Sequence, residues 1–288
     1  MSPKNNVDRD NKDSRMKRHA VVIYFGLTFA ISWLGALAVV AQKLLRGEPV
    51  PKFTGILMFP VMLLGPVVSG ILLTRLVDGS SGLRDLFSHM RRFRVGAQWY
   101  AALLIPPSAI LVVLLCLKTF VSPVYAPNRF FAGVSFGIVA GFFEEIGWTG
   151  YAFPKMTRTG NALGASIALG LLWGIWHMPV IDYLGTATPH GAYWLRYFLA
   201  FTAAMTAIRV LIGWIYTNTK SVTLAQMMHA SSTGSLVVFS PANVTPGQEA
   251  MWYAVYAAAL WLVVAIVVAK FGPTLVRRSG SENPAKLE

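Results

Sequence analysis

Two adjacent glutamates, Glu144 and Glu145, lie inside an apolar stretch, residues 130–153, that otherwise has the composition of a membrane-spanning helix. Two further apolar segments each carry one histidine, His177 and His229. Ionisable side chains at membrane depth are costly, so their presence favours a functional role. Carboxylates and imidazoles together are the groups that general acid–base catalysis uses. The sequence therefore predicts a proton-transfer site within an apolar environment.

Other hydrolytic sites fit this chain poorly. Only Asp182 among the aspartates lies near the end of an apolar segment, so an intramembrane aspartyl dyad cannot form within one chain. No histidine is followed by glutamate, which excludes the HExxH arrangement of zinc proteases. Residues 133–137 have the GxSxG pattern of a nucleophile elbow, but an elbow needs a strand that enters a helix, and this string lies in an apolar helix. We interpret it as small-residue helix packing.

The composition predicts a polytopic integral membrane protein. Hydrophobic residues make up 55% of the 288 residues, and the mean hydropathy is +0.54, both above what a soluble surface tolerates. The formal net charge of +13 could indicate a nucleic-acid partner. However, Lys and Arg cluster between the apolar segments, as a topology signal does, so we expect no nucleic acid. The single cysteine, Cys116, is interpreted as a packing residue.

An all-α fold with about eight transmembrane helices is expected. Each apolar segment is close to the roughly 20 residues that a bilayer requires. The first exceeds the apolar core of a signal peptide, about 7–15 residues, so we expect a retained span. The glutamates and histidines lie on the fourth, fifth and seventh segments, which predicts a site in the core of the bundle. The segments are 20–42, 53–74, 98–117, 130–153, 161–181, 193–216, 221–240 and 250–269.

The distribution of basic residues predicts the orientation. With the N-terminus inside, 18 of the 25 Lys and Arg residues fall on the cytoplasmic side and six in outer loops, while Arg209 lies within the sixth segment. Both termini are therefore predicted to be cytoplasmic, and we expect the membrane to be a bacterial plasma membrane. One transmembrane domain, 19–272, is expected between disordered polar tails, 1–18 and 273–288. The basic run 91–94 is interpreted as an anchor to anionic lipid headgroups.

Three short motifs occur in order on separate apolar segments. Residues 144–151 read EEIGWTGY, residues 173–177 read WGIWH, and residues 229–233 read HASST. They resemble the signature of the CPBP family, the intramembrane proteases related to CAAX prenyl endopeptidases and to bacteriocin-immunity proteins: EExxxR, then aromatic-xxx-His, then HxxxN. The resemblance spans roughly residues 130–237. One such motif is weak evidence, whereas three in order are specific.

The resemblance implies peptide-bond hydrolysis and a role for each motif. Glu144 would be the base that takes a proton from water, with Glu145 in the same site and His177 helping to hold and activate the water. Trp173 would lie against the ring of His177. The third motif, His229 and the residue four positions later on the same helix face, would supply contacts to the oxyanion.

Two positions depart from the family pattern. Thr149 stands where EExxxR has arginine, and Thr233 stands where HxxxN has asparagine. The first departure removes the local counter-ion of Glu145, and Arg209 is our candidate for a replacement, because an arginine within a span itself needs an acid or backbone carbonyls. The second is milder, since Thr233 can still donate one hydrogen bond. The residues expected to support the site or bind substrate are Trp148, Thr149, Trp173 and Arg209.

The chemistry of these residues leaves the question of a metal open. Glu144, Glu145, His177 and His229 are acceptable nitrogen and oxygen ligands for zinc, with Glu144 and the two histidines as the leading candidates. The same residues suit a glutamate-activated water without a cofactor, and this metal-free reading is favoured.

The leading functional prediction is an intramembrane endopeptidase that hydrolyses a peptide bond of a membrane-associated protein or peptide in the lipid bilayer. Because the arginine and the asparagine of the family pattern are missing, the alternative is a non-proteolytic family member that acts as a membrane regulatory or immunity scaffold. A proton-coupled transporter is less favoured, since the chain shows no inverted repeat. No residue pattern identifies a prenyl group as part of the substrate.

Overall fold

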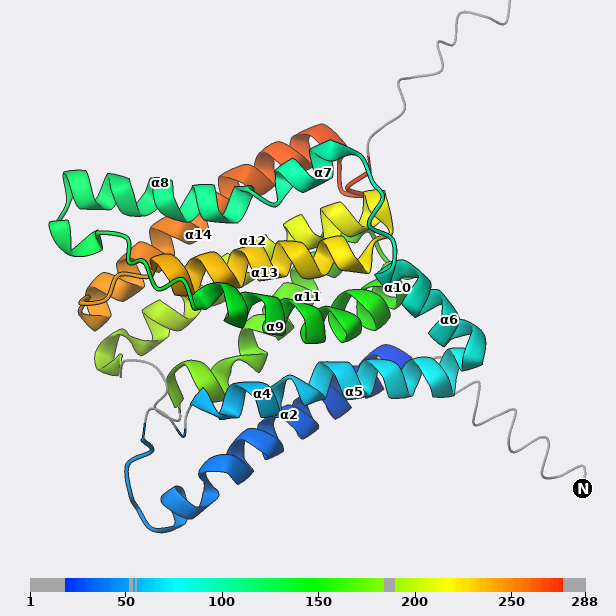
Figure 1. Cartoon of the computed structure of the whole chain (residues 1–288), viewed down its shortest axis with the longest axis horizontal. Helices are drawn as coiled ribbons and strands as arrows, with labels where there is room; N and C mark the ends of the chain where they lie inside the picture. Colours follow the sequence, from blue (N-terminus) through cyan, green and yellow to red (C-terminus); the bar gives the residue numbers. More distant parts are fainter. Residues whose placement is uncertain (1–18, 52–53, 55, 184–189, 277–288) are drawn as a thin grey trace, which may run out of the picture.

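Helices form every regular element in the part of the chain that the structure describes (Figure 1). This computed structural model describes residues 19–51, 54, 56–183 and 190–276. The predicted tail 1–18 lies outside these residues, as do residues 277–288 of the second predicted tail. The α-helices are α2 (Ala20–Leu45), α4 (Met58–Met62), α5 (Leu64–Leu73), α6 (Gly79–Met90), α7 (Ala97–Ala102), α8 (Ile105–Phe120), α9 (Gly133–Gly147), α10 (Phe153–Met156), α11 (Ala162–Trp176), α12 (Trp194–Thr219), α13 (Val222–Phe239) and α14 (Pro246–Phe271).

Short helical turns of other types join several of these helices. Three are π-helical and two are 3₁₀ turns. Two of the π-helical turns directly follow residues that the sequence singles out for chemistry. The turns are η1 (Thr74–Asp78), η2 (Pro123–Tyr125), η3 (Trp148–Ala152), η4 (Pro179–Tyr183) and η5 (Gly191–Tyr193).

The helices form the polytopic membrane bundle that the composition predicts. Within the described ranges, five helical stretches are long and apolar enough to cross a membrane, compared with the eight segments drawn from the sequence. The other three segments form α9, α11 and α13, which are shorter or more polar. The glutamates and histidines lie in or next to these three helices. Polar motif residues and adjacent π-helical turns make the three helices too polar or too short to count among the five. The five stretches are Ala20–Leu45, Met58–Met90, Ala97–Phe120, Gly191–Thr219 and Pro246–Phe271.

Helix α12 lies at the centre of the bundle. It packs against α11, α13 and α14, and α13 packs in turn against α9. Beyond α9, helices α5 and α2 form the lower layer in Figure 1, while α8 and α14 form the upper layer. Helix α12 has a fully buried central turn that includes Val210, Leu211 and Ile212. Side chains that project from the middle of α12 therefore enter the interior of the bundle.

Successive long helices run in opposite directions, as the spans of a polytopic membrane protein do. The start of α2 and the end of α14 lie at the right-hand end of the bundle in Figure 1, together with α6 and α10. The opposite end holds the end of α8 and the starts of α9 and α12. The right-hand end carries most of the described Lys and Arg residues, in agreement with the basic segments predicted to be cytoplasmic. The assignment of that end to the cytoplasm stays a prediction.

Close backbone contact between α9 and α13 depends on glycines at four-residue intervals. A Cβ atom on Gly137 would lie 2.4 Å from the carbonyl oxygen of Ala230, and one on Gly141 would lie 2.5 Å from that of Gln226. Small residues let helices approach so closely in membranes, where packing rather than hydrophobicity drives helix association. The interpretation of GxSxG as helix packing is therefore confirmed.

We expect Gly137→Ala to destabilise the bundle by about 1–3 kcal/mol, because the new methyl group overpacks the contact with α13. Gly26→Ala in α2 is the matched control, since nothing lies within 4 Å of the position of its Cβ. Thermal unfolding of both variants in detergent would measure the difference. Equal melting temperatures for the two variants would contradict the packing argument.

Candidate active site

The chain leaves regular α-helical geometry three residues after Glu145. Helix α9 ends at Gly147, and the π-helical turn η3 follows. Before this turn, the amide of Gln226 on α13 donates a hydrogen bond of 2.8 Å to the backbone carbonyl of Phe142. Single π-helical turns are frequent at functional sites because they re-aim side chains. Gln226 was not predicted as a site residue, although it is a polar residue three positions before His229 on an apolar helix.

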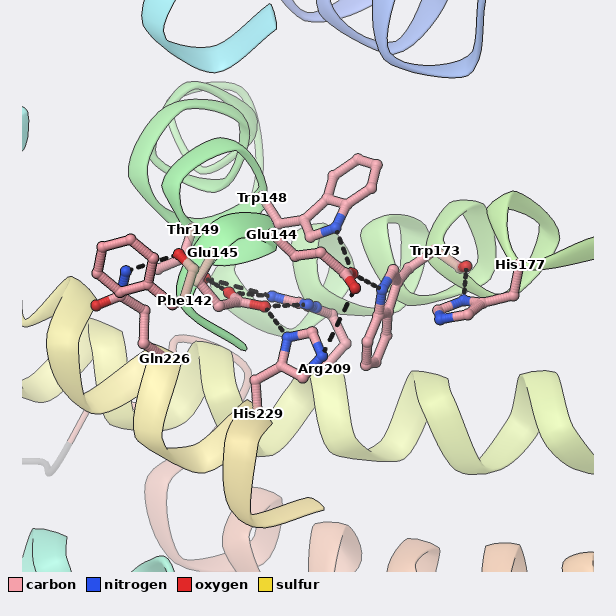
Figure 2. A network of polar contacts seen from close by, with 10 residues as sticks. All are labelled: Phe142, Glu144, Glu145, Trp148, Thr149, Trp173, His177, Arg209, Gln226 and His229. Carbon is pink, nitrogen blue, oxygen red and sulfur yellow. Dashed lines mark hydrogen bonds and ion pairs between the residues drawn. The ribbon is translucent and has the colours of Figure 1, made fainter. Parts of the chain in front are cut away.

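Glu145 is paired with Arg209, as the sequence predicts (Figure 2). Nη1 of Arg209 donates to Oε2 of the glutamate at 2.8 Å, and Nη2 donates to Oε1 at 2.7 Å. Glu145 is 0% exposed and Arg209 is 1% exposed, so the pair is fully buried. This bidentate geometry satisfies both charges within the bundle. Arg209 projects from the centre of α12 and thus replaces the missing local counter-ion.

Thr149 takes part in the same pair. Its hydroxyl donates to Oε2 of Glu145 and accepts a 3.3 Å hydrogen bond from Nη1 of Arg209. The position at which EExxxR has arginine thus holds a short side chain that joins a carboxylate to an arginine from another helix. The first departure from the family pattern is thereby compensated in space.

Glu144 has neutral partners. Its Oε2 accepts hydrogen bonds from the indole Nε1 of Trp173 at 2.7 Å and of Trp148 at 3.1 Å. The carboxylate is 2% exposed, and no lysine or arginine of the described chain forms an ion pair with it. Its other oxygen, Oε1, lies 4.0 Å from Nε2 of His229. Glu144 is therefore the carboxylate of the pair that keeps an oxygen available for a proton.

His229 connects the two glutamates. Its Nδ1 lies 2.8 Å from Oε1 of Glu145, and its Nε2 faces Glu144. Because a carboxylate paired with arginine only accepts hydrogen bonds, the hydrogen of this contact is assigned to Nδ1. A second hydrogen on Nε2 would make the ring an imidazolium. The carboxylate of Glu145 thus orients the ring so that Nε2 points to Glu144.

Trp173 separates His177 from this cluster. Its indole donates to Glu144, and its ring lies 4.9 Å from the ring of His229 and 4.7 Å from the guanidinium of Arg209. The ring of His177 packs against the other side, at 5.3 Å, and its Nδ1 lies 2.7 Å from the carbonyl of Trp173 (Figure 2). The expected contact between the two rings is present. The structure brings His177 to Trp173 but not to Glu144.

Thr233 lies one turn beyond His229 on α13. It is partly exposed, and the structure records no hydrogen bond between it and any residue of the cluster in the described chain. Its predicted contact to an oxyanion stays a prediction.

The candidate zinc ligands are not arranged as a metal site. Oε2 of Glu144 accepts from two indoles, Glu145 is held by an arginine, and His177 lies beyond Trp173. Within the described residues, no group of three or more His, Cys, Asp or Glu side chains could hold a metal ion. This donor set therefore does not fit zinc in the present geometry.

The region of the three motifs matches a known protein family. Residues 126–235 match the model of a family described as type II CAAX prenyl endopeptidase, Rce1-like. Over 95 residues the chain is 32% identical to CAAX prenyl protease 2 of Methanococcus maripaludis, strain DSM 14266. That alignment covers 32% of this chain and 35% of the relative, so it spans about a third of the length of either protein. The matched family region runs from just before α9 into α13.

Proposed function

We propose that the protein is an intramembrane endopeptidase of the CAAX protease family, in which Glu144 activates water to hydrolyse a peptide bond. The match of residues 126–235 to that family supports the proposal. The substrate is a membrane-associated protein or peptide. The observation that carries the proposal is the unequal pairing of two adjacent buried carboxylates. Glu145 is neutralised by Arg209, whereas Glu144 is held by two indoles and keeps Oε1 open toward His229.

The reaction follows from this arrangement. A water molecule bound to Oε1 of Glu144 gives its proton to the carboxylate, and its oxygen attacks the carbonyl carbon of the substrate. The carbonyl oxygen becomes an oxyanion in the tetrahedral intermediate. Glu144 then gives the proton to the leaving amine, and the C–N bond breaks. The two indole hydrogen bonds fix the orientation of the carboxylate through these steps.

We assign stabilisation of the oxyanion to His229. The buried carboxylates of Glu144 and Glu145 and the guanidinium of Arg209 sum to one negative charge, and an imidazolium at His229 brings the buried cluster to zero. A buried cluster of balanced charge is less costly than one with a net charge. In the imidazolium form Nε2 donates a hydrogen bond toward the space beside Glu144, where a preorganised donor stabilises developing charge.

His177 acts through Trp173 in this account. Its Nδ1 donates to the Trp173 carbonyl, and its ring supports the indole that holds Glu144. This assignment replaces a direct contact with water, because the indole lies between His177 and the carboxylate (Figure 2). We therefore place His177 among the positioning residues.

Trp173→Phe is expected to lower kcat by about 10- to 150-fold, because a buried hydrogen bond to a charged group contributes about 1.5–3 kcal/mol. The phenyl ring keeps the contacts with Arg209 and His229 but has no N–H group for Glu144. Trp261→Phe is the matched control, since it also loses one indole hydrogen bond, 3.0 Å to the Ala203 carbonyl, away from the glutamates. Peptide hydrolysis rates of the two variants would be compared. Equal kcat values would contradict the orienting role of Trp173.

Chelation is expected to leave hydrolysis unchanged within about twofold, because the proposed base is oriented by hydrogen bonds rather than by a metal. The measurement is the hydrolysis rate before and after prolonged treatment with a strong chelator, followed by addition of zinc. A loss of activity that zinc restores would assign a metal to Glu144 and the histidines and would overturn the metal-free proposal.

Hydrolysis of a peptide library tests the proposed function. The peptides carry a fluorophore, a quencher and a lipid anchor, and the protein is purified in detergent. Cleavage by wild type but not by Glu144→Ala supports the endopeptidase. Equal cleavage by both proteins means a contaminating protease. If neither protein cleaves any peptide while a membrane partner binds both equally, the scaffold function is favoured instead.

A further inference from the structure

A pocket away from the glutamates opens at the basic end of the bundle. It has a volume of about 980 Å³ and lies between the start of α2, the turn η1, the short helix α10 and the first half of α11. Its apolar lining includes Val21, Val77, Met156 and Ala168. Its polar lining combines Asp78, Lys155, Arg158 and Thr159. Such a mixture of an apolar wall and a cationic rim fits an amphiphile with a negatively charged head.

Among the described residues, one cation of the rim has no carboxylate partner. Nζ of Lys155 donates to both oxygens of Asp78, at 2.9 Å and 2.7 Å, and lies 4.7 Å from the centre of the Tyr151 ring. An ammonium group has three donors, so one remains for a ligand. Arg158 is exposed, and none of the described carboxylates lies within ion-pair distance of it. The rim therefore carries one net positive charge and at least one spare ammonium donor.

The position of the pocket indicates the source of the ligand. Its lining comes from the start of α2 and from α10, which lie with α6 at one end of the bundle (Figure 1). Most of the described Lys and Arg residues belong to segments at that end. Basic pockets between transmembrane helices bind anionic lipid headgroups, and the cytoplasmic leaflet is rich in such lipids. A free phosphate ion would use the rim but would leave the apolar wall without a partner.

We propose that this pocket binds one anionic phospholipid. The phosphate contacts Arg158 and the spare donor of Lys155, and an acyl chain lies along Val21, Val77 and Ala168. The single net positive charge of the rim matches the single negative charge of a phosphodiester. This binding does not depend on hydrolysis, so it can be tested separately from the function of Glu144.

A fluorescent phosphatidylglycerol titrated into the full-length protein in an uncharged detergent tests the proposal. We expect saturable binding that weakens about fivefold in Arg158→Gln, because one basic residue near a membrane surface contributes about 1 kcal/mol toward an anionic lipid. Arg84→Gln is the charge control, since Arg84 lies on α6 at the same end but does not line the pocket. It is expected to bind within about twofold of wild type.

A second pair of variants tests the apolar wall. Ala168 is exposed on α11 and lines the pocket, so Ala168→Phe fills the space without overpacking the core. Its affinity is expected to fall about tenfold, which is about 1.4 kcal/mol. Leu171→Phe, at an exposed position on the same helix, is the control and should bind as wild type. Size-exclusion profiles of all four variants verify folding.

Two competitors identify the source of the ligand. Phosphatidylcholine, which has the same phosphate but no net charge, should bind at least about fivefold more weakly, and inorganic phosphate should not displace the fluorescent lipid. Displacement by inorganic phosphate would replace the lipid site with a simple anion site. Equal binding of the two lipids would overturn the proposal. It would also be overturned if Arg158→Gln and Ala168→Phe bound the lipid as tightly as their control variants do.

Discussion

Replacing Glu144 by glutamine is expected to lower peptide hydrolysis about 10³-fold, the range that a general base contributes, while the fold is retained. The amide oxygen of glutamine still accepts the hydrogen bonds of Trp148 and Trp173, so the local packing persists. The amide cannot take a proton from water. Initial hydrolysis rates, together with thermal unfolding of the same preparation, would separate loss of the base from loss of the fold.

The matched control is an acid outside the bundle interior. Glu48→Gln removes a half-exposed carboxylate that pairs with Lys43 at the opposite end of α2 from the pocket. Its hydrolysis rate should equal that of wild type. A Glu144→Gln variant that retains more than about a tenth of the wild-type rate would rule out this residue as the base, since a general base contributes at least about 10²-fold.

Arg209→Leu is expected to destabilise the protein by about 3–5 kcal/mol, because it leaves the buried carboxylate of Glu145 without its counter-ion. The thermal midpoint in detergent should fall sharply, and hydrolysis should be lost with it, since Glu145 also orients His229. Arg209→Lys should recover only part of the stability, because an ammonium group cannot make the bidentate contact. Unchanged stability and function in Arg209→Leu would contradict the pairing as the basis of the site.

A compensating substitution at a second position tests the same ion pair. Thr149 lies one turn from Glu145, so arginine at this position can reach the same carboxylate from within the helix. The double variant Thr149→Arg with Arg209→Leu restores the arginine of the EExxxR pattern and should recover part of the lost stability. Thr149→Arg alone places two guanidinium groups around one buried carboxylate and should destabilise. A double variant no more stable than Arg209→Leu would show that the two positions are not equivalent.

The ion pair could be predicted from sequence because a charge within a membrane span needs a partner. Arg209 lies well inside a predicted span, whereas Arg196 lies near the end of the same span, and Glu145 lacks the local arginine of the motif. Arg209 and Glu145 were therefore expected to pair. The glycine spacing likewise predicted close helix packing, although not that α13 is the partner. In each case the local sequence contained a feature that needs a partner, either a charge within a span or a glycine face that allows close helix contact.

The surroundings of Glu144 could not be predicted in the same way. His177 lies one residue beyond the end of α11, and its ring turns back to the carbonyl of Trp173, four residues earlier. Pro179 indicates that the helix ends near this position, but it does not show that the ring turns back. The indole of Trp173, rather than the ring of His177, therefore contacts Glu144. The π-helical turn that follows Glu145 and the hydrogen bond from Gln226 also could not be predicted, because both depend on how α13 packs against α9.

Single-turnover hydrolysis in ¹⁸O-labelled water is the measurement that tests the central claim most directly. A cleaved library peptide would be incubated with excess protein, and the new carboxyl group analysed by mass spectrometry. Activated water predicts one ¹⁸O atom in the product from wild type, and a labelled product that forms about 10³-fold more slowly from Glu144→Gln. A product without ¹⁸O would mean that a protein carboxylate attacked the peptide. A labelled product that forms at equal rates with both proteins would mean that Glu144 is not the base.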